Sequence, residues 1–139
     1  QKSKGANAYF AWGSWLSASN PVIRDIHEYC LVFSKDSMKN SSGGVSTIEK
    51  DEFMESTLSI WNINPEKAKK IGHPAPFPVE LPKRFINLYS FKEDLVLDPF
   101  IGSGTTAVAS KILQRNYVGY EINKDYIEIA DKRLQAETS

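Results

Sequence analysis

Apolar positions in the carboxyl-terminal third of the chain repeat with two different periods. Residues 95–97 and 118–121 are short apolar runs bounded by polar or turn-forming residues, which is typical of strands in a buried sheet. Residues 105–115 and 124–136 instead space their apolar side chains along one helical face, and Asn123 is suited to capping the second helix. The order strand, helix, strand, helix predicts a βαβα unit with a parallel sheet. The side chains expected to face the core are Ala107, Val108, Ala109, Ile112 and Leu113 in the first helix and Tyr126, Ile127, Ala130 and Leu134 in the second.

The amino-terminal part of the chain gives weaker signals. Residues 29–33 are a continuous apolar run with β-branched and aromatic members, which predicts a buried strand, and residues 58–60 predict a short one. Residues 9–16 are rich in aromatic side chains and fit a short strand or an ordered loop. Residues 35–44 contain serine, asparagine and paired glycines, which indicate a flexible loop, and residues 50–54 fit one helical turn.

Prolines set the expected helix starts and extended segments between residues 64 and 89. Asn64 and Pro65 fit the cap and the first position of a helix, which predicts a short helix over residues 66–70. Four prolines between residues 74 and 82 then make the chain stiff and extended. The last of them suits the start of a helix that runs to about residue 89. The side chains expected to face inward on that helix are Phe85, Ile86 and Leu88.

Composition limits the classes of protein to which the chain can belong. A length of 139 residues with 41% hydrophobic and 24% charged residues fits one globular domain. The 17 basic and 17 acidic residues cancel, so net charge gives no general attraction to nucleic acid. Cys30 is the single cysteine, which excludes an internal disulfide and favours the reducing cytoplasm. The sequence contains no run long and apolar enough for a membrane span, no signal-peptide pattern and no metal-ligand spacing.

The most informative chemistry lies between the strand at residues 95–97 and the helix that follows it. Asp98 ends the strand, and Gly102 and Gly104 form a tight turn before the helix. Glycines at such a turn let bare backbone N–H groups approach a ligand. One carboxylate beside several amide donors suits a ligand that carries both an ammonium and a carboxylate, such as a methionine-like zwitterion.

A dinucleotide-binding turn is the main alternative interpretation. Gly102, Gly104 and Ala107 satisfy the G-x-G-x-x-A pattern, and Glu121 follows near the distance expected for a ribose-binding acid. Asp98 argues against this alternative, because a carboxylate at that point repels a pyrophosphate and attracts an ammonium. Helix capping and binding of a cofactor carboxylate explain the threonine pair that opens the helix equally well.

Three segments resemble the amino-group DNA methyltransferase family. Asp98, Pro99 and Phe100, followed by the run from Gly102 to Thr106, are similar to its S-adenosylmethionine signature. Residues 73–82 resemble the second cofactor motif of a permuted subclass, and residues 117–123 resemble its next strand. Weaker matches at residues 11–15 and 27–35 extend the resemblance over nearly the whole chain. Only residues 36–57 match nothing specific.

The resemblance implies a Rossmann-like S-adenosylmethionine-dependent α/β fold, here incomplete, with one methyltransferase domain over residues 1–139. Its parts would be a strand region at residues 1–34, a variable DNA-recognition segment at residues 35–64 and a cofactor-binding part at residues 65–139. Asp98 would hold the methionine ammonium and Glu121 the ribose hydroxyls. Ile122 would cover one face of the adenine or pack in the core. The implied cofactor-binding residues are Asp98, Pro99, Phe100, Gly102, Ser103, Gly104, Thr105, Thr106, Glu121, Ile122, His73, Phe77 and Pro78.

The catalytic motif expected of this family is missing from the chain. The family places an Asp-or-Ser/Asn-Pro-Pro-aromatic tetrapeptide before the cofactor motif in this subclass, and the sequence contains no Pro-Pro pair. The resemblance therefore implies the carboxyl-terminal part of a modification methylase for adenine N6 or cytosine N4, inactive by itself. Its expected partners are double-stranded DNA and the amino-terminal part, a second chain or another copy. The alternatives are an RNA or small-molecule methyltransferase, an NAD-type domain, or a non-catalytic fragment that needs a partner chain.

Overall fold

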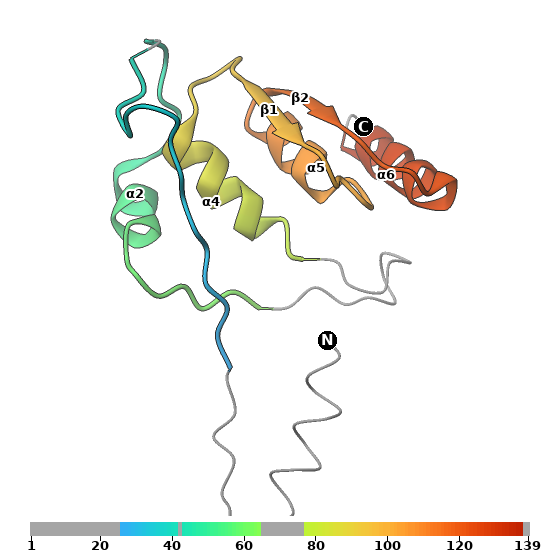
Figure 1. The fold of residues 1–139 in the computed structure, drawn as a ribbon, viewed down its shortest axis with the longest axis horizontal. Helices are drawn as coiled ribbons and strands as arrows, with labels where there is room; N and C mark the ends of the chain where they lie inside the picture. The colour runs from blue at the N-terminus through green and yellow to red at the C-terminus, as the bar shows by residue number, and fades with distance from the viewer. Residues whose placement is uncertain (1–25, 42, 65–76, 138–139) are drawn as a thin grey trace, which may run out of the picture. The chain divides into compact units, whose positions relative to one another are not determined.

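The structure, a computed structural model, describes residues 26–41, 43–64 and 77–137 of the chain. The chain divides between Met38 and Lys39 into two compact units. All the helices and strands described belong to the second unit (Figure 1). They are α2 (Lys50–Ser56), α4 (Glu80–Tyr89), β1 (Leu95–Asp98), α5 (Thr105–Ile112), β2 (Asn116–Gly119) and α6 (Lys124–Ala136).

The two strands confirm the parallel βαβα unit that the sequence predicts. β1 and β2 are parallel neighbours, with Leu95 paired to Asn116 and Asp98 paired to Gly119. β2 begins and ends two residues earlier than predicted. The reason is that Tyr120 already bonds to the turn after β1, since its carbonyl accepts the N–H of Ile101 at 3.0 Å. The chain therefore leaves the regular ladder before Glu121.

Helix α5 lies at the centre of the core. Ala107, Val108 and Ala109 are 0%, 3% and 0% exposed, as predicted, and α5 contacts α4, β2 and α6. The helix ends at Ile112, three residues earlier than predicted, and Ile112 is exposed rather than buried. The cause is a reversal of the backbone at Gln114, which has a φ of +60°. Such a left-handed conformation ends a helix.

Helix α6 follows its sequence signal residue for residue. It covers Lys124–Ala136, as predicted, and the Asn123 side chain accepts the N–H of Asp125 at 2.9 Å. This hydrogen bond satisfies one of the N–H groups left unpaired at a helix start. Ala130 is 7% exposed at the centre of the buried stripe, whereas Ile127 on the same stripe is exposed.

Helix α4 begins at Glu80, two residues before the predicted start at Pro82. A proline is tolerated there because the first turn of a helix has N–H groups without intrahelical partners. Ile86 is buried as predicted, and Phe85 and Leu88 are half-buried. The Arg84 guanidinium bonds to Glu80 at 2.8 Å and, across to α2, to Glu55 at 2.7 Å. The hydrogen bond that the guanidinium donates to Glu80 raises the pKa of Arg84, although burial opposes the shift.

Buried Arg115 connects the end of α4 to two loops. Its guanidinium donates to the Ser90 carbonyl at 2.8 Å, to the Leu113 carbonyl at 2.6 Å and to Thr47 Oγ1 at 2.5 Å. Burial lowers the pKa of this guanidinium, whereas the charge of Asp94 acts in the opposite direction. The network joins segments that lie far apart in the sequence and fixes the position of α4 relative to α5.

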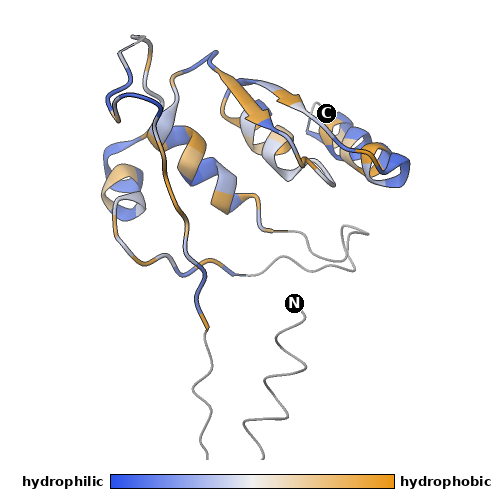
Figure 2. Ribbon diagram, viewed as in Figure 1, coloured by the Kyte–Doolittle hydropathy of each residue, from blue (hydrophilic) through white to orange (hydrophobic). Residues whose placement is uncertain are grey.

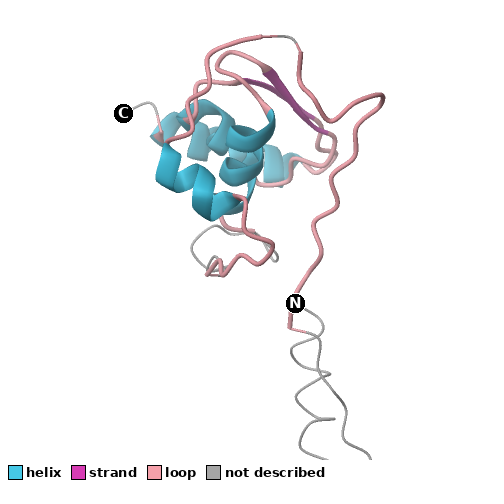
Figure 3. Cartoon of the chain, turned by 90° about the vertical axis from the view of Figure 1, so that its left-hand side faces the viewer, coloured by secondary structure: helices cyan, strands magenta, loops and turns pink. Residues whose placement is uncertain are grey.

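One face of the two-stranded sheet is left uncovered by the helices of the described residues. Leu95 and Leu97 are 65% and 61% exposed, whereas Val96 and Asp98, on the other face, are half-buried. Figure 2 shows hydrophobic colouring over most of β1, and Figure 3 shows the helices gathered on one side of the strands. The helices in the described residues therefore shield only one face of the sheet. None of these helices is long and apolar enough to cross a membrane.

Two of the predicted strands are wrong. Residues 26–34 form no helix or strand, and Tyr29, Leu31 and Phe33 are 80%, 74% and 83% exposed. Residues 58–60 also lack regular structure. An apolar run becomes a strand only where a second strand takes up its hydrogen bonds, and none of the described segments does so for either run. The predictions for residues 9–16 and 66–70 lie outside the described residues.

Candidate functional site

The candidate site lies at the carboxyl ends of β1 and β2. Because the strands are parallel and Asp98 pairs with Gly119, the turn after β1 and the segment after β2 lie at the same edge of the sheet. The Tyr120 N–H donates to the Asp98 carbonyl at 3.1 Å and extends this contact beyond the strands. Ligands of open α/β sheets bind at this edge.

The carboxylate of Asp98 is oriented by two hydrogen bonds from the turn that follows it. Oδ1 accepts the N–H of Phe100 at 2.9 Å, and Oδ2 accepts the hydroxyl of Thr106 at 2.6 Å. Thr106 belongs to the first turn of α5, so the helix start holds the acid in one orientation. A carboxylate offers about four lone-pair sites, so it can still accept a bond from a ligand.

Both glycines of the turn adopt backbone conformations that other residues avoid. Gly102 has a φ of +53° and Gly104 a φ of +81°. A Cβ on Gly104 would lie 2.7 Å from the Cβ of Ala130 in α6. Gly104 is therefore required by its left-handed conformation and by the close approach of α6, a second reason that the sequence alone does not indicate.

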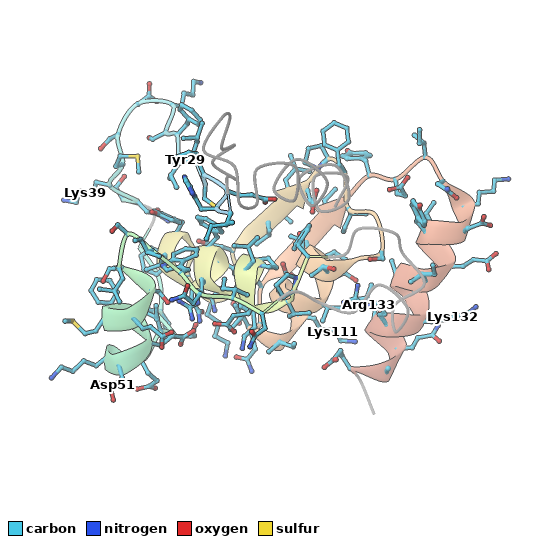
Figure 4. All side chains as sticks on the ribbon, turned by 90° about the horizontal axis from the view of Figure 1, so that it is seen from below. Tyr29, Lys39, Asp51, Lys111, Lys132 and Arg133 are labelled. Atoms are coloured by element: carbon cyan, nitrogen blue, oxygen red, sulfur yellow. The ribbon has the colours of Figure 1, made fainter. Side chains whose placement is uncertain are left out.

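Two polar residues of the turn bond to α6. Ser103 and Thr105 are 4% and 3% exposed, and both accept hydrogen bonds from the Arg133 guanidinium. The sequence does not single out Arg133, so this contact was missed. The available signal is the three-residue spacing between Ala130 and Arg133, which places both on one face of the helix. Figure 4 shows Arg133 and Lys132 pointing to different sides of α6.

Glu121 and two large apolar side chains border the same edge of the sheet. Glu121 is half-buried, and its Oε1 accepts the N–H of Asn123 at 2.8 Å. Ile122 is 100% exposed and Phe100 is 87% exposed. Core packing, the alternative interpretation for Ile122, is therefore not what the structure shows. Exposed apolar groups beside an acid suit a ligand with a flat ring and a hydroxylated sugar.

The remaining predicted site residues are only partly described. Pro99 is exposed in the turn after β1. Phe77 is 42% exposed, and the Pro78 carbonyl accepts the N–H of Leu81 at the start of α4. His73 lies outside the described residues. Across the described part of the chain, no group of three or more His, Cys, Asp or Glu side chains is placed to hold a metal ion.

A comparison with protein families identifies the family to which the chain belongs. A family model described as DNA methylase matches residues 4–132, which is nearly the whole chain. The chain belongs to the N6/N4 DNA methylase family. This DNA methylase chain is 42% identical over 133 residues to the type II methyltransferase M.BglI of Bacillus subtilis, covering 90% of the chain and 36% of that relative. It is 35% identical over 143 residues to M.MjaI of Methanocaldococcus jannaschii, covering 95% of the chain and 46% of that relative.

A solved structure supports the fold of the DNA methylase chain. A candidate DNA modification methylase of Thermus thermophilus, crystallised with S-adenosyl-L-methionine, superposes with a TM-score of 0.57 at 36% identity. The match covers 66% of this chain and 35% of that one. The described residues therefore form part of a Rossmann-like methyltransferase fold. The chain spans less than half the length of the curated relatives that it matches.

Proposed function

We propose that this chain forms the donor-binding part of an enzyme that methylates DNA. The methyl group would pass from S-adenosyl-L-methionine to an exocyclic amino group, N6 of adenine or N4 of cytosine. The observation that carries the proposal is the edge of the sheet where oriented Asp98 and half-buried Glu121 lie beside a turn with two positive φ values. The T. thermophilus protein, which contains the same cofactor, supports this choice of ligand.

Each side of the candidate site suits a different part of that cofactor. Asp98 would accept a hydrogen bond from the methionine ammonium, and the backbone around Gly102 and Gly104 would approach the cofactor closely. Glu121 would accept hydrogen bonds from the two ribose hydroxyls. The N–H of Asn123 already orients this carboxylate by donating to its Oε1. Ile122 and Phe100 would cover the adenine. Bound there, S-adenosyl-L-methionine supplies an electrophilic methyl group on its sulfonium.

His73, Phe77 and Pro78 would complete the pocket on the methionine side. This assignment rests on their resemblance to the second cofactor motif of the family. Phe77 is exposed and therefore accessible to a ligand. His73 would wall the pocket rather than act as a general base.

The acceptor side of the reaction needs residues that this sequence does not contain. A target base must leave the duplex stack to reach the donor, and the Pro-Pro-aromatic motif that would hold it is missing. We propose that a segment of different sequence, in the same polypeptide or in a second chain, supplies that motif. The uncovered face around Leu95 and Leu97 offers apolar area for such a partner. The reaction would take place in the cytoplasm, the compartment that the lone Cys30 favours.

A calorimetric titration tests the proposal directly. The 139-residue chain should bind S-adenosylhomocysteine and S-adenosylmethionine, and it should not bind NAD⁺. Binding of NAD⁺ alone would replace the proposal with a dinucleotide-binding module. Once the partner segment is present, methylation assays with DNA and RNA side by side should label DNA. Labelling of RNA alone would contradict the assignment of the substrate.

A further inference from the structure

Arg133, in the last turn of α6, donates hydrogen bonds to the glycine turn that follows β1. Its Nη1 donates to the Ser103 carbonyl at 2.8 Å, to Thr105 Oγ1 at 3.0 Å and to Ser103 Oγ at 3.2 Å. The two acceptor residues flank Gly104 on both sides. One cationic nitrogen thus contacts the turn immediately before and after its buried glycine.

The contact fixes the peptide unit between Ser103 and Gly104 at both ends. Its carbonyl accepts from Arg133, and its N–H donates to the Ile101 carbonyl at 2.9 Å. Glycine has wide conformational freedom, so a glycine turn needs outside contacts to hold a single shape. Hydrogen bonds from a charged donor are roughly twice as strong as neutral ones. The acceptor residues of Arg133, Ser103 and Thr105, are also nearly inaccessible to solvent.

Ala130, which precedes Arg133 by about one turn of α6, lies against the same glycine turn. A Cβ on Gly104 would lie 3.1 Å from the Cα of Ala130, so α6 lies against the turn without intervening side chains. Ala130 and Arg133 are three residues apart and share one face of the helix. Steric support from Ala130 and hydrogen bonds from Arg133 therefore come from the same element.

We propose that Arg133 is a positioning residue for the cofactor site, which holds the turn from Gly102 to Thr106 in its ligand-binding conformation. This inference rests on the proposed function. Arg133 bonds to the turn itself, so its effect on a ligand passes through the backbone. A turn that is ordered before the ligand arrives loses less entropy on binding, and the affinity is correspondingly higher.

Lys111 provides a matched control. It is also cationic and also joins α5 to α6, because its Nζ donates to the Leu134 carbonyl at 2.7 Å. This hydrogen bond attaches to the end of α6, whereas those of Arg133 attach to the turn. Figure 4 labels both side chains beside α6. Loss of a contact between the helices can thus be separated from loss of support for the turn.

The experiment compares the unchanged chain with Arg133→Met, Arg133→Lys and Lys111→Met. Calorimetry with S-adenosylhomocysteine measures affinity, and thermal unfolding measures stability. Arg133→Met should weaken binding by about tenfold, because the ligand must then order the turn as it binds. Arg133→Lys should recover part of that loss, since an ammonium can still reach one acceptor. Lys111→Met should bind as the unchanged chain does, even with a lower melting temperature.

Hydrogen exchange of the turn amides keeps the proposal testable in the free chain. Exchange at residues 102–106 should be faster in Arg133→Met than in Lys111→Met. If the unchanged chain does not bind S-adenosylhomocysteine, the proposed function fails, and this exchange difference alone decides the role of Arg133. If Arg133→Met does not fold, Thr105→Val, which removes one acceptor, should still accelerate exchange and weaken binding. Native affinity together with native exchange in the Arg133 variants, or in Thr105→Val in that case, overturns the proposal.

Discussion

The hydroxyl of Thr106 donates a 2.6 Å hydrogen bond to Oδ2 of Asp98, so the first turn of α5 orients the acid that ends β1. The two residues lie eight positions apart, on opposite sides of the glycine turn. The hydrogen bond therefore closes the turn as well as aiming the carboxylate. An acid held this way is ready to meet an ammonium without first losing rotamer freedom.

Removing this hydroxyl should weaken cofactor binding. Thr106→Val keeps the branched shape and loses the donor, so we expect about a fivefold to tenfold weaker affinity for S-adenosylhomocysteine in calorimetry. Thr106→Ser should remain close to the unchanged chain. Thr57→Val is a matched control, because the Thr57 hydroxyl donates to the Phe53 and Met54 carbonyls of its own helix, α2, and not to the site. Equal affinity in Thr106→Val and Thr57→Val would contradict a role for the Asp98–Thr106 pair.

The two acids of the site should each contribute strongly to affinity. A hydrogen bond to a charged group contributes roughly 1.5–3 kcal/mol, so Asp98→Ala and Glu121→Ala should each weaken S-adenosylhomocysteine binding by about tenfold to a hundredfold. Glu128→Gln, on the exposed side of α6, is the control and should leave affinity unchanged. Calorimetry that finds native affinity in both alanine variants would refute the site assignment.

Gly104 should be far less tolerant of a side chain than Gly43, which has a similar φ of +72° and open space around it. Gly43→Ala should lower the free energy of unfolding, measured by urea titration, by about 1–2 kcal/mol. This is the cost of placing a residue with a Cβ in the left-handed conformation. Gly104→Ala should cost more, because its Cβ would also lie 2.7 Å from that of Ala130. Adding Ala130→Gly to Gly104→Ala should restore part of the difference. Equal costs at the two glycines would show that α6 does not constrain the turn.

The chain alone should transfer no methyl group to DNA. Donor-binding motifs are present, but the Pro-Pro-aromatic motif for the acceptor base is not. Incubation with labelled S-adenosylmethionine and duplex DNA should give no incorporation until a segment with that motif is added, in one chain or in trans. Incorporation by the unsupplemented chain would mean that catalytic residues lie within these 139 positions.

Local signals were sufficient for the elements around the site. The Asn123 cap and the apolar stripe behind it predicted α6 to the residue, and the glycine pair after an apolar run located the turn and α5. Asp98 and Glu121 could be selected because parallel strands place their carboxyl ends at one edge. These features depend on windows of a few residues, within which capping and periodicity act.

The contacts that hold the site together depended on the tertiary structure. Residues 29–33 have the composition of a strand yet remain exposed, because a strand requires a neighbour that composition cannot supply. Arg133 was not singled out by the sequence, because its hydrogen bonds reach 30 residues back to Ser103. Gly104 was read as a turn residue, whereas Ala130 also excludes a side chain there. Sequence patterns alone determined the strands and helices from residue 95 onward, because their periodicity and caps depend on near neighbours. Only the path of the chain decided which side chains support the turn, because that depends on contacts between residues distant in sequence.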